Sequence, residues 1–188
     1  MKTKDQRVLQ FKVSLTGSKP LVWRRILVPS EATFDILSES IQDAFGWNGG
    51  HLHQFWTKGA YGAGSRAIVD KNIEELEEDE NAADESETKV NDLLKKAGDH
   101  VTYEYDFGDG WLHAVVLEKI LEKEMGEEYP RCIDGKNACP PEDCGGLGGY
   151  AHLLEVLKNP KHPEHRDMRE WLELEEGEKF DPTYFEVE

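Results

Sequence analysis

Residues 8–15 alternate between apolar and polar side chains, and this alternation constrains the fold of the chain more than any other feature. One face of the segment carries Leu9, Phe11, Val13 and Leu15. A period of two is typical of a β-strand with one buried face. Gly17–Pro20 interrupts the pattern before an apolar run at residues 22–28, so the two segments predict an antiparallel hairpin.

An amphipathic helix is expected directly after this hairpin. Thr33 suits the N-cap position and Gly46 suits the helix end. One helical face carries Phe34, Leu37, Ile41, Ala44 and Phe45. A helix and a sheet must bury their apolar faces together. The order therefore predicts an α+β domain in which the helix covers a mixed or antiparallel sheet, by analogy β-grasp-like.

The rest of the chain is expected to add strands and then helices. Residues 51–56 predict a third strand, and residues 101–107 and 111–120 predict a second hairpin around a Gly-Asp-Gly turn. The part from 145 to 188 is expected to be helical. Short helices are expected at residues 90–97, 150–158 and 164–174. At 188 residues the chain fits a single domain, 1–188.

The formal net charge is −17, from 39 acidic and 22 basic residues. Such a chain repels phosphate backbones, so broad nucleic-acid binding is not expected. Glu74–Glu87 holds nine of the acids and no base, which predicts a flexible acidic excursion over about residues 70–88. We interpret Arg24 and Arg25 as strand residues paired with some of these many carboxylates.

The sequence has no basic leader and no run of eighteen apolar residues. A membrane partner is therefore not expected, and the chain is expected to be cytoplasmic. Three cysteines cannot form a closed set of disulfides, and reduced thiols suit that compartment.

The stretch from Tyr103 to His113 combines aromatic, acidic and glycine residues more densely than plain scaffolding needs. Aromatic rings with polar neighbours are typical of binding surfaces. The first functional hypothesis is therefore a binding or scaffold module that contacts a protein or a small molecule. Its contact residues would be Trp47, Tyr103, Tyr105 and Trp111.

A second hypothesis places zinc in the segment rich in glycine and proline that follows. Cys132, Cys139 and Cys144 could supply three thiolates, and His113 is the candidate fourth ligand. Such a set would make a closed structural zinc site. The segment has no Cys-x-x-Cys pair, and three ordinary half-buried thiols are the alternative.

A third hypothesis is a metal-dependent, hydrolase-like enzyme. His51 and His53 would point to the same face of a strand, because side chains alternate along it. With Asp106 and His113 they could bind a divalent metal or act as acid–base groups. The alternative is that the histidines are ordinary strand residues, that Asp106 binds backbone amides, and that Asp109 only shapes the turn. Whether the chain is an enzyme stays open at this level.

The chain also resembles the Ri-plasmid ORF-3-like family of small bacterial and archaeal proteins. The resemblance depends on segments spread in one order over nearly the whole chain. These are Pro20–Pro29, Gly46-Trp47, His51–Phe55, Tyr103–His113, Cys132–Gly146 and Phe180–Pro182. It implies a single α+β domain with a β-grasp-like sheet and trailing helices, and no established catalytic residues. Some relatives are carried on plasmids or insertion elements, which implies a further alternative, an accessory protein of such elements.

Overall fold

The alternating segment at the start of the chain forms the middle of a large sheet. The computed structural model describes residues 6–58, 64–73, 76 and 80–187. Strand β1 (Arg7–Leu15) pairs antiparallel with β2 (Trp23–Pro29), and Phe11 lies opposite Ile26. On its other side β1 pairs antiparallel with β7 (Trp111–Glu122). The predicted first hairpin is thus confirmed.

Eight strands form the sheet in the described part of the chain. Their order across it is β5-β4-β3-β6-β7-β1-β2-β8. The remaining strands are β3 (His53–Trp56), β4 (Ala67–Val69), β5 (Ala83–Asp84), β6 (His100–Tyr105) and β8 (Arg131–Lys136). Neighbouring strands run antiparallel except β4 and β5, which are parallel. The sheet is therefore mixed, and the domain is α+β as predicted.

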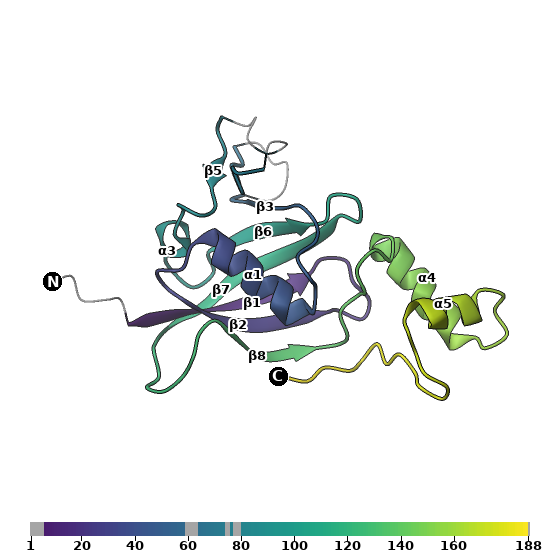
Figure 1. Ribbon diagram of the computed structural model, residues 1–188. Coiled ribbons are helices and arrows are strands. Elements are labelled where there is room, and N and C mark those ends of the chain that lie inside the picture. Colours follow the sequence, from purple (N-terminus) through teal and green to yellow (C-terminus); the bar gives the residue numbers. More distant parts are fainter. Residues whose placement is uncertain (1–5, 59–63, 74–75, 77–79, 188) are drawn as a thin grey trace.

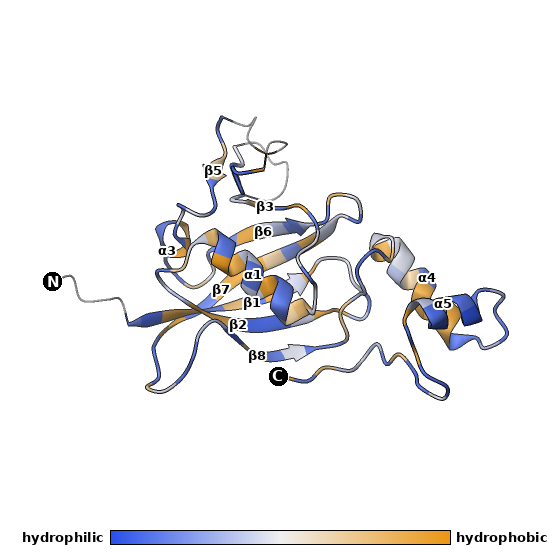
Figure 2. Cartoon of the chain, viewed as in Figure 1, coloured by the Kyte–Doolittle hydropathy of each residue, from blue (hydrophilic) through white to orange (hydrophobic). Residues whose placement is uncertain are grey.

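Helix α1 (Phe34–Phe45) lies across one face of the sheet (Figure 1). Its buried side chains join one core with the strands, and the Phe34 and Phe55 rings meet edge to face at 5.0 Å. Figure 2 shows apolar and polar residues alternating along the ribbon of α1. The predicted helix ends are observed, since Gly46 adopts φ 74° and Thr33 precedes the first turn in an extended conformation.

The Tyr103 hydroxyl is a buried polar contact between the sheet and α1. It lies 2.9 Å from the Ser38 hydroxyl and accepts a hydrogen bond from Gln42 Nε2 at 2.9 Å. Burial raises its pKa above the usual value for tyrosine, so the group is a neutral phenol. A buried hydroxyl with satisfied partners fixes how the helix sits on β6.

Several segments differ from the expectations. Strand β8 lies at the start of the segment rich in glycine and proline, where the sequence predicts no strand, and residues 131–136 pair with the edge of β2. The predicted helix at 90–97 is a single turn, α3 (Val90–Leu93). The acidic excursion is anchored at its end, since β5 pairs with β4 and Glu85 is buried. Residues 74, 75 and 77–79 of that excursion lie outside the described residues.

Helices α4 (Gly146–Lys158) and α5 (His165–Trp171) lie together to one side of the sheet (Figure 1). Tyr150 and Leu153 of α4 belong to the main core. None of the described helices is long and apolar enough to cross a membrane.

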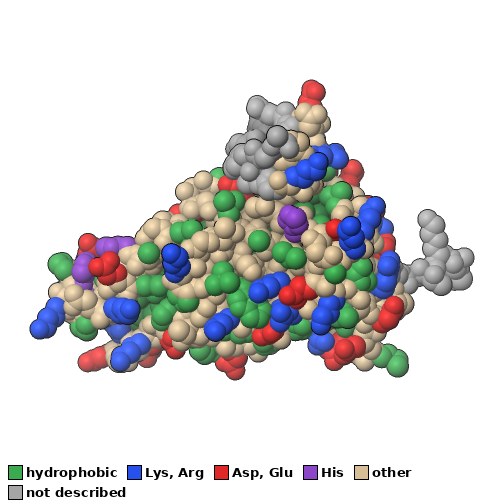
Figure 3. All heavy atoms as spheres, turned by 180° about the vertical axis from the view of Figure 1, so that it is seen from behind, with side chains coloured by type: hydrophobic (Ala, Val, Ile, Leu, Met, Phe, Trp, Pro, Cys, Tyr) green, Lys and Arg blue, Asp and Glu red, His purple; other side chains and the backbone are tan. Residues whose placement is uncertain are grey.

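The view from behind shows basic and acidic side chains interspersed over the sheet (Figure 3). Arg25 pairs with Glu118 at 2.7 Å and with Asp134 at 2.5 Å. Arg24 is buried and donates to the carbonyl oxygens of Ala44 and Asn137. Arg25 therefore pairs with carboxylates as interpreted from the sequence, whereas the partners of Arg24 are backbone carbonyls and Cys139.

Replacing Tyr103 with Phe is expected to lower the free energy of unfolding by about 1–2 kcal/mol, because two buried polar groups lose their shared partner. Urea denaturation followed by circular dichroism measures this change. Tyr184→Phe at an exposed position is the matched control and is expected to stay within about 0.5 kcal/mol of wild type. Equal stabilities of the two variants would contradict the assigned role of the hydroxyl.

Candidate functional site

The four aromatic residues expected to form a contact surface lie in the core. Tyr103, Tyr105 and Trp111 are fully buried, and Trp47 keeps only 5% exposure. The Trp47 and Tyr105 rings stack with centroids 4.9 Å apart. These four side chains form an aromatic cluster in the main core, and the rest of the domain covers their rings.

His113 belongs to the same aromatic cluster. Its ring centroid lies 4.8 Å from that of Phe45, 5.4 Å from that of Trp47 and 5.6 Å from that of Tyr103. Burial lowers the pKa of His113 to about 3, so the imidazole is neutral at pH 7. Neither ring nitrogen makes a well-formed hydrogen bond to the described residues. Aromatic rings surround this histidine, and it does not belong to the group of described residues whose possible ligand atoms lie within 4.8 Å of one another.

The three cysteines do not come together with His113. Among the described residues, no group of three metal-ligand atoms within 4.8 Å of one another contains a cysteine. Arg24 Nη2 donates to Cys139 Sγ at 2.8 Å. Burial raises the pKa of Cys139 and Cys144 to about 12 and raises that of Cys132 above its usual value. Burial therefore disfavours the thiolate form of each cysteine, and none of the three gathers with His113 into a set of ligand atoms.

His53 contacts Glu85 and not the residues around His51. Its Nε2 atom lies 2.9 and 3.2 Å from the two carboxylate oxygens of Glu85. Glu85 is only 4% exposed. The pair fixes the end of the acidic segment beside β3, and the two histidines do not share a site.

His51 instead lies between two carboxylates. Its Nδ1 atom is 3.6 Å from Asp106 Oδ2, and its Nε2 atom is 3.3 Å from Asp143 Oδ1. One ligand atom from each residue lies within 4.8 Å of the other two. The structure therefore brings together two of the predicted candidates, His51 and Asp106, and adds a third from the cysteine segment.

The cysteine segment reaches the site because hydrogen bonds fix it to the loop after α1. Trp47 Nε1 donates to the Pro140 carbonyl at 3.0 Å. The Glu142 carboxylate accepts from the Asn48 amide at 3.1 Å and from the Tyr105 hydroxyl at 2.5 Å. Charge-assisted bonds of this kind are stronger than neutral ones. They position the residue that follows Glu142 against the imidazole.

Asp106 performs two tasks with its two oxygens. Its Oδ1 atom accepts from the backbone amides of Gly108 and Asp109 at 2.9 and 3.2 Å. Its Oδ2 atom faces His51. The sequence left two alternatives for Asp106, a carboxylate that binds backbone amides or a residue of the site. In the structure it binds the turn amides and also faces His51.

Asp109 does more than shape the turn. Its Oδ2 atom accepts from the amide of Gly145, the N-cap residue of α4, at 3.1 Å. A carboxylate is stabilised at a helix N-terminus by the helix dipole. A Cβ atom on Gly146 would lie only 2.4 Å from the Asp109 carbonyl oxygen. Only glycine allows this close approach, so the turn and α4 are held at a fixed spacing.

Sequence reasoning missed three acidic residues of this region: Glu85, Glu142 and Asp143. Glu85 lies in an acidic run that resembles a solvated surface segment. The other two stand between cysteines, which drew attention to the thiols. A usable signal was present, because two acids directly follow Pro140-Pro141, where the backbone is stiff and side chains are presented in fixed directions.

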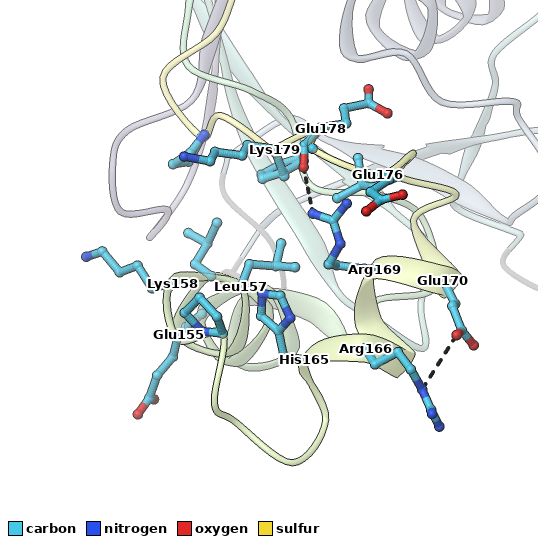
Figure 4. A pocket seen from close by; sticks show the side chains of 17 residues that line it. Glu155, Leu157, Lys158, His165, Arg166, Arg169, Glu170, Glu176, Glu178 and Lys179 are labelled. Carbon is cyan, nitrogen blue, oxygen red and sulfur yellow. Dashed lines mark hydrogen bonds and ion pairs between the residues drawn. The ribbon is translucent and has the colours of Figure 1, made fainter.

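A large cavity lies away from His51. It has a volume of about 1030 Å³ and opens between α4, α5 and the C-terminal segment (Figure 4). Two of the arginines that line it have partners within this part of the chain. Arg169 donates to the carbonyl oxygens of Glu175 and Glu178, and Arg166 pairs with Glu170 at 3.6 Å. The two bonds of Arg169 hold the C-terminal segment against α5.

The fold and the site define an α+β domain that gathers polar ligand atoms where three loops meet. The chain belongs to the plasmid pRiA4b ORF-3-like protein family, whose model matches residues 7–188. It is 32% identical over 165 residues to the uncharacterized protein y4hQ of Sinorhizobium fredii, covering 87% of this chain and 80% of that protein. A crystal structure of a protein of unknown function from Methanosarcina mazei Go1 is 38% identical, with a TM-score of 0.81 and 96% of each chain covered.

The buried His113 is expected to make stability fall as the pH is lowered from 7 to 5. The pKa is about 3 in the folded chain and 6.5 for an ordinary histidine, so in this range the unfolded chain binds more protons. Stability therefore rises with pH across the window. His113→Phe removes this contribution. Between pH 7 and pH 5 its free energy of unfolding is expected to fall by about 2 kcal/mol less than that of the wild type.

Urea denaturation at both pH values measures the difference. His100→Gln, a change at an exposed histidine, is expected to keep the wild-type dependence on pH. If His113→Phe and wild type lose the same stability, His113 is not buried in its neutral form.

Proposed function

We propose that this protein is a divalent-metal-binding domain whose ion is held by His51, Asp106 and Asp143. The observation that carries the proposal is the convergence of one imidazole and two carboxylates from separate loops within 4.8 Å. The activity that such an ion would support is metal-assisted hydrolysis.

The donor set suits a first-row transition metal. Imidazole favours zinc, iron or nickel, and carboxylates favour harder ions such as manganese. Ligands about 2.1 Å from a tetrahedral zinc lie roughly 3.4 Å from one another. The contact between His51 Nδ1 and Asp106, at 3.6 Å, is close to this spacing. The contact with Asp143 is made by the other ring nitrogen, and the set with one ligand atom from each residue lies within 4.8 Å.

The lengths of these contacts also favour an ion. Hydrogen bonds between nitrogen and oxygen are usually 2.7–3.2 Å long. The His53–Glu85 pair, at 2.9 Å, meets this criterion. The two contacts of His51, at 3.6 and 3.3 Å, are longer than this. The spacing leaves room for a bridging cation.

The backbone around both carboxylates is unusual. Asp106 has a φ of 55° and Asp143 a φ of 58°, in the left-handed region that non-glycine residues seldom adopt. Uncommon backbone conformations gather at functional sites, where the surroundings enforce them. Here the conformation turns both side chains toward His51.

The ion would be accessible to a ligand. The side chain of Asp143 is 71% exposed and that of His51 is 30% exposed. Three protein ligands with one position left for water are typical of catalytic zinc, whereas structural sites are closed by four. A water molecule bound there would become a nucleophile near neutral pH.

The other hypotheses have less support. A binding module based on Trp47, Tyr103, Tyr105 and Trp111 would need those rings at the surface, and they are buried. A role as an accessory protein of plasmids or insertion elements is supported by the family description, which names a plasmid.

Titration of tag-free, metal-stripped protein with Zn²⁺ or Mn²⁺ in a calorimeter is expected to show one bound ion per chain. Asp143→Gly is expected to weaken binding by about tenfold or more, because one ligand is lost. Glycine adopts the same positive φ without strain, so the variant is expected to keep its free energy of unfolding. Any metal-dependent hydrolysis of an activated ester is expected to be lost with the ion.

Glu173→Gly is the matched control, since Glu173 also has a positive φ, 54°, and lies at the end of α5. It is expected to bind metal as wild type does. Wild-type protein that takes up no ion, or Asp143→Gly protein with unchanged affinity, would rule out this site.

A further inference from the structure

A second cavity is lined in part by Asp143, which is also one of the three residues of the proposed metal site. It has a volume of about 360 Å³ and lies between α4 and α5. Its lining includes Asp143, Cys144, Gly149, Leu153, Met168 and Trp171. Small-molecule sites usually fall between about 300 and 1,000 Å³. This cavity is of that size and adjoins His51 through Asp143.

The walls of the cavity are mostly apolar. Leu153 is part of the main core and Met168 packs against it. Trp171 leaves 46% of its surface exposed, which is unusual for so large a ring. Cys144 is half-buried and packs against the main core, as a small hydrophobic group does. These four side chains would suit an uncharged carbon skeleton.

The charged groups that line the cavity have partners. His152 Nε2 lies 2.8 Å from Glu164 Oε2, and Asp167 pairs with Arg166 at 3.4 Å. Asp143 lies 3.3 Å from His51 Nε2, so it is the point at which the cavity meets the proposed metal site. A metal ion bound there would attract an oxygen anion.

We propose that this cavity is the subsite for the body of the substrate that binds at the metal centre. The ligand would be a small molecule with an uncharged apolar body and an oxygen-donor head, such as a carboxylate or a carbonyl group. The head would occupy the free position on the ion, and the body would lie between α4 and α5. This inference depends on the metal site proposed above.

Two hydroxamate probes test the inference on zinc-loaded, full-length protein. Acetohydroxamate carries the chelating head alone, and benzohydroxamate adds an apolar ring. Benzohydroxamate is expected to bind about tenfold more tightly, because apolar groups in a matching pocket commonly give at least this discrimination. Isothermal titration calorimetry gives both dissociation constants.

Trp171→Ala is expected to remove most of the advantage of benzohydroxamate and to leave the affinities for Zn²⁺ and acetohydroxamate unchanged. Its ring is largely at the surface, so the variant is expected to fold. Trp23→Ala is the matched control, because Trp23 lies on β2 against Lys12 and Arg25, and it is expected to keep the wild-type preference.

The outcomes separate the two proposals. If zinc binds and the two probes have equal affinities, the cavity is not a substrate subsite and the metal site stands. The same conclusion follows if Trp171→Ala weakens both probes equally. If zinc does not bind, the metal site and the subsite are both overturned.

Discussion

The Glu142 carboxylate joins parts of the chain that are far apart in sequence, and the arrangement of the site depends on this junction. One oxygen accepts the Tyr105 hydroxyl from the end of β6, and the other accepts the Asn48 amide from the loop after α1. Burial and the carboxylate itself raise the pKa of Tyr105, so the phenol keeps its proton to donate. With these bonds in place, Asp143 lies against His51. The bonds from Trp47 to Pro140 and from Gly145 to Asp109 hold the same segment on either side of Glu142.

Much of the fold could be predicted because its periodic segments bury one face. The first hairpin, α1 and the second hairpin follow from alternation, capping residues and a Gly-Asp-Gly turn. Strand β8 (Arg131–Lys136) could not, because an edge strand held mainly by pairing with β2 has no strong apolar pattern. The two-residue strand β5 lies in an acidic run and could not be predicted for the same reason. Its position depends on tertiary contacts such as His53–Glu85.

The candidate site was only partly predictable, and the errors have one cause. Residue type shows which chemistry is available, but burial decides which residues can use it. His113 and Tyr103 have suitable side chains and lie in the core. The cysteines drew attention to their segment, whereas the acids between them face the neighbouring loop. His51 and His53 were expected on one face, but His51 precedes β3, so the alternation of a strand does not apply to it.

The distribution of carboxylates around the site gives a physical reason for a cation there. Asp106, Asp109, Glu142 and Asp143 gather in a chain with a net charge of −17. Three of them are offset by donors: turn amides for Asp106, the N-terminus of α4 for Asp109, and a phenol and an amide for Glu142. Among the described residues, the contact that offsets Asp143 is His51 alone. A divalent ion between His51, Asp106 and Asp143, as proposed above, would add positive charge beside these carboxylates.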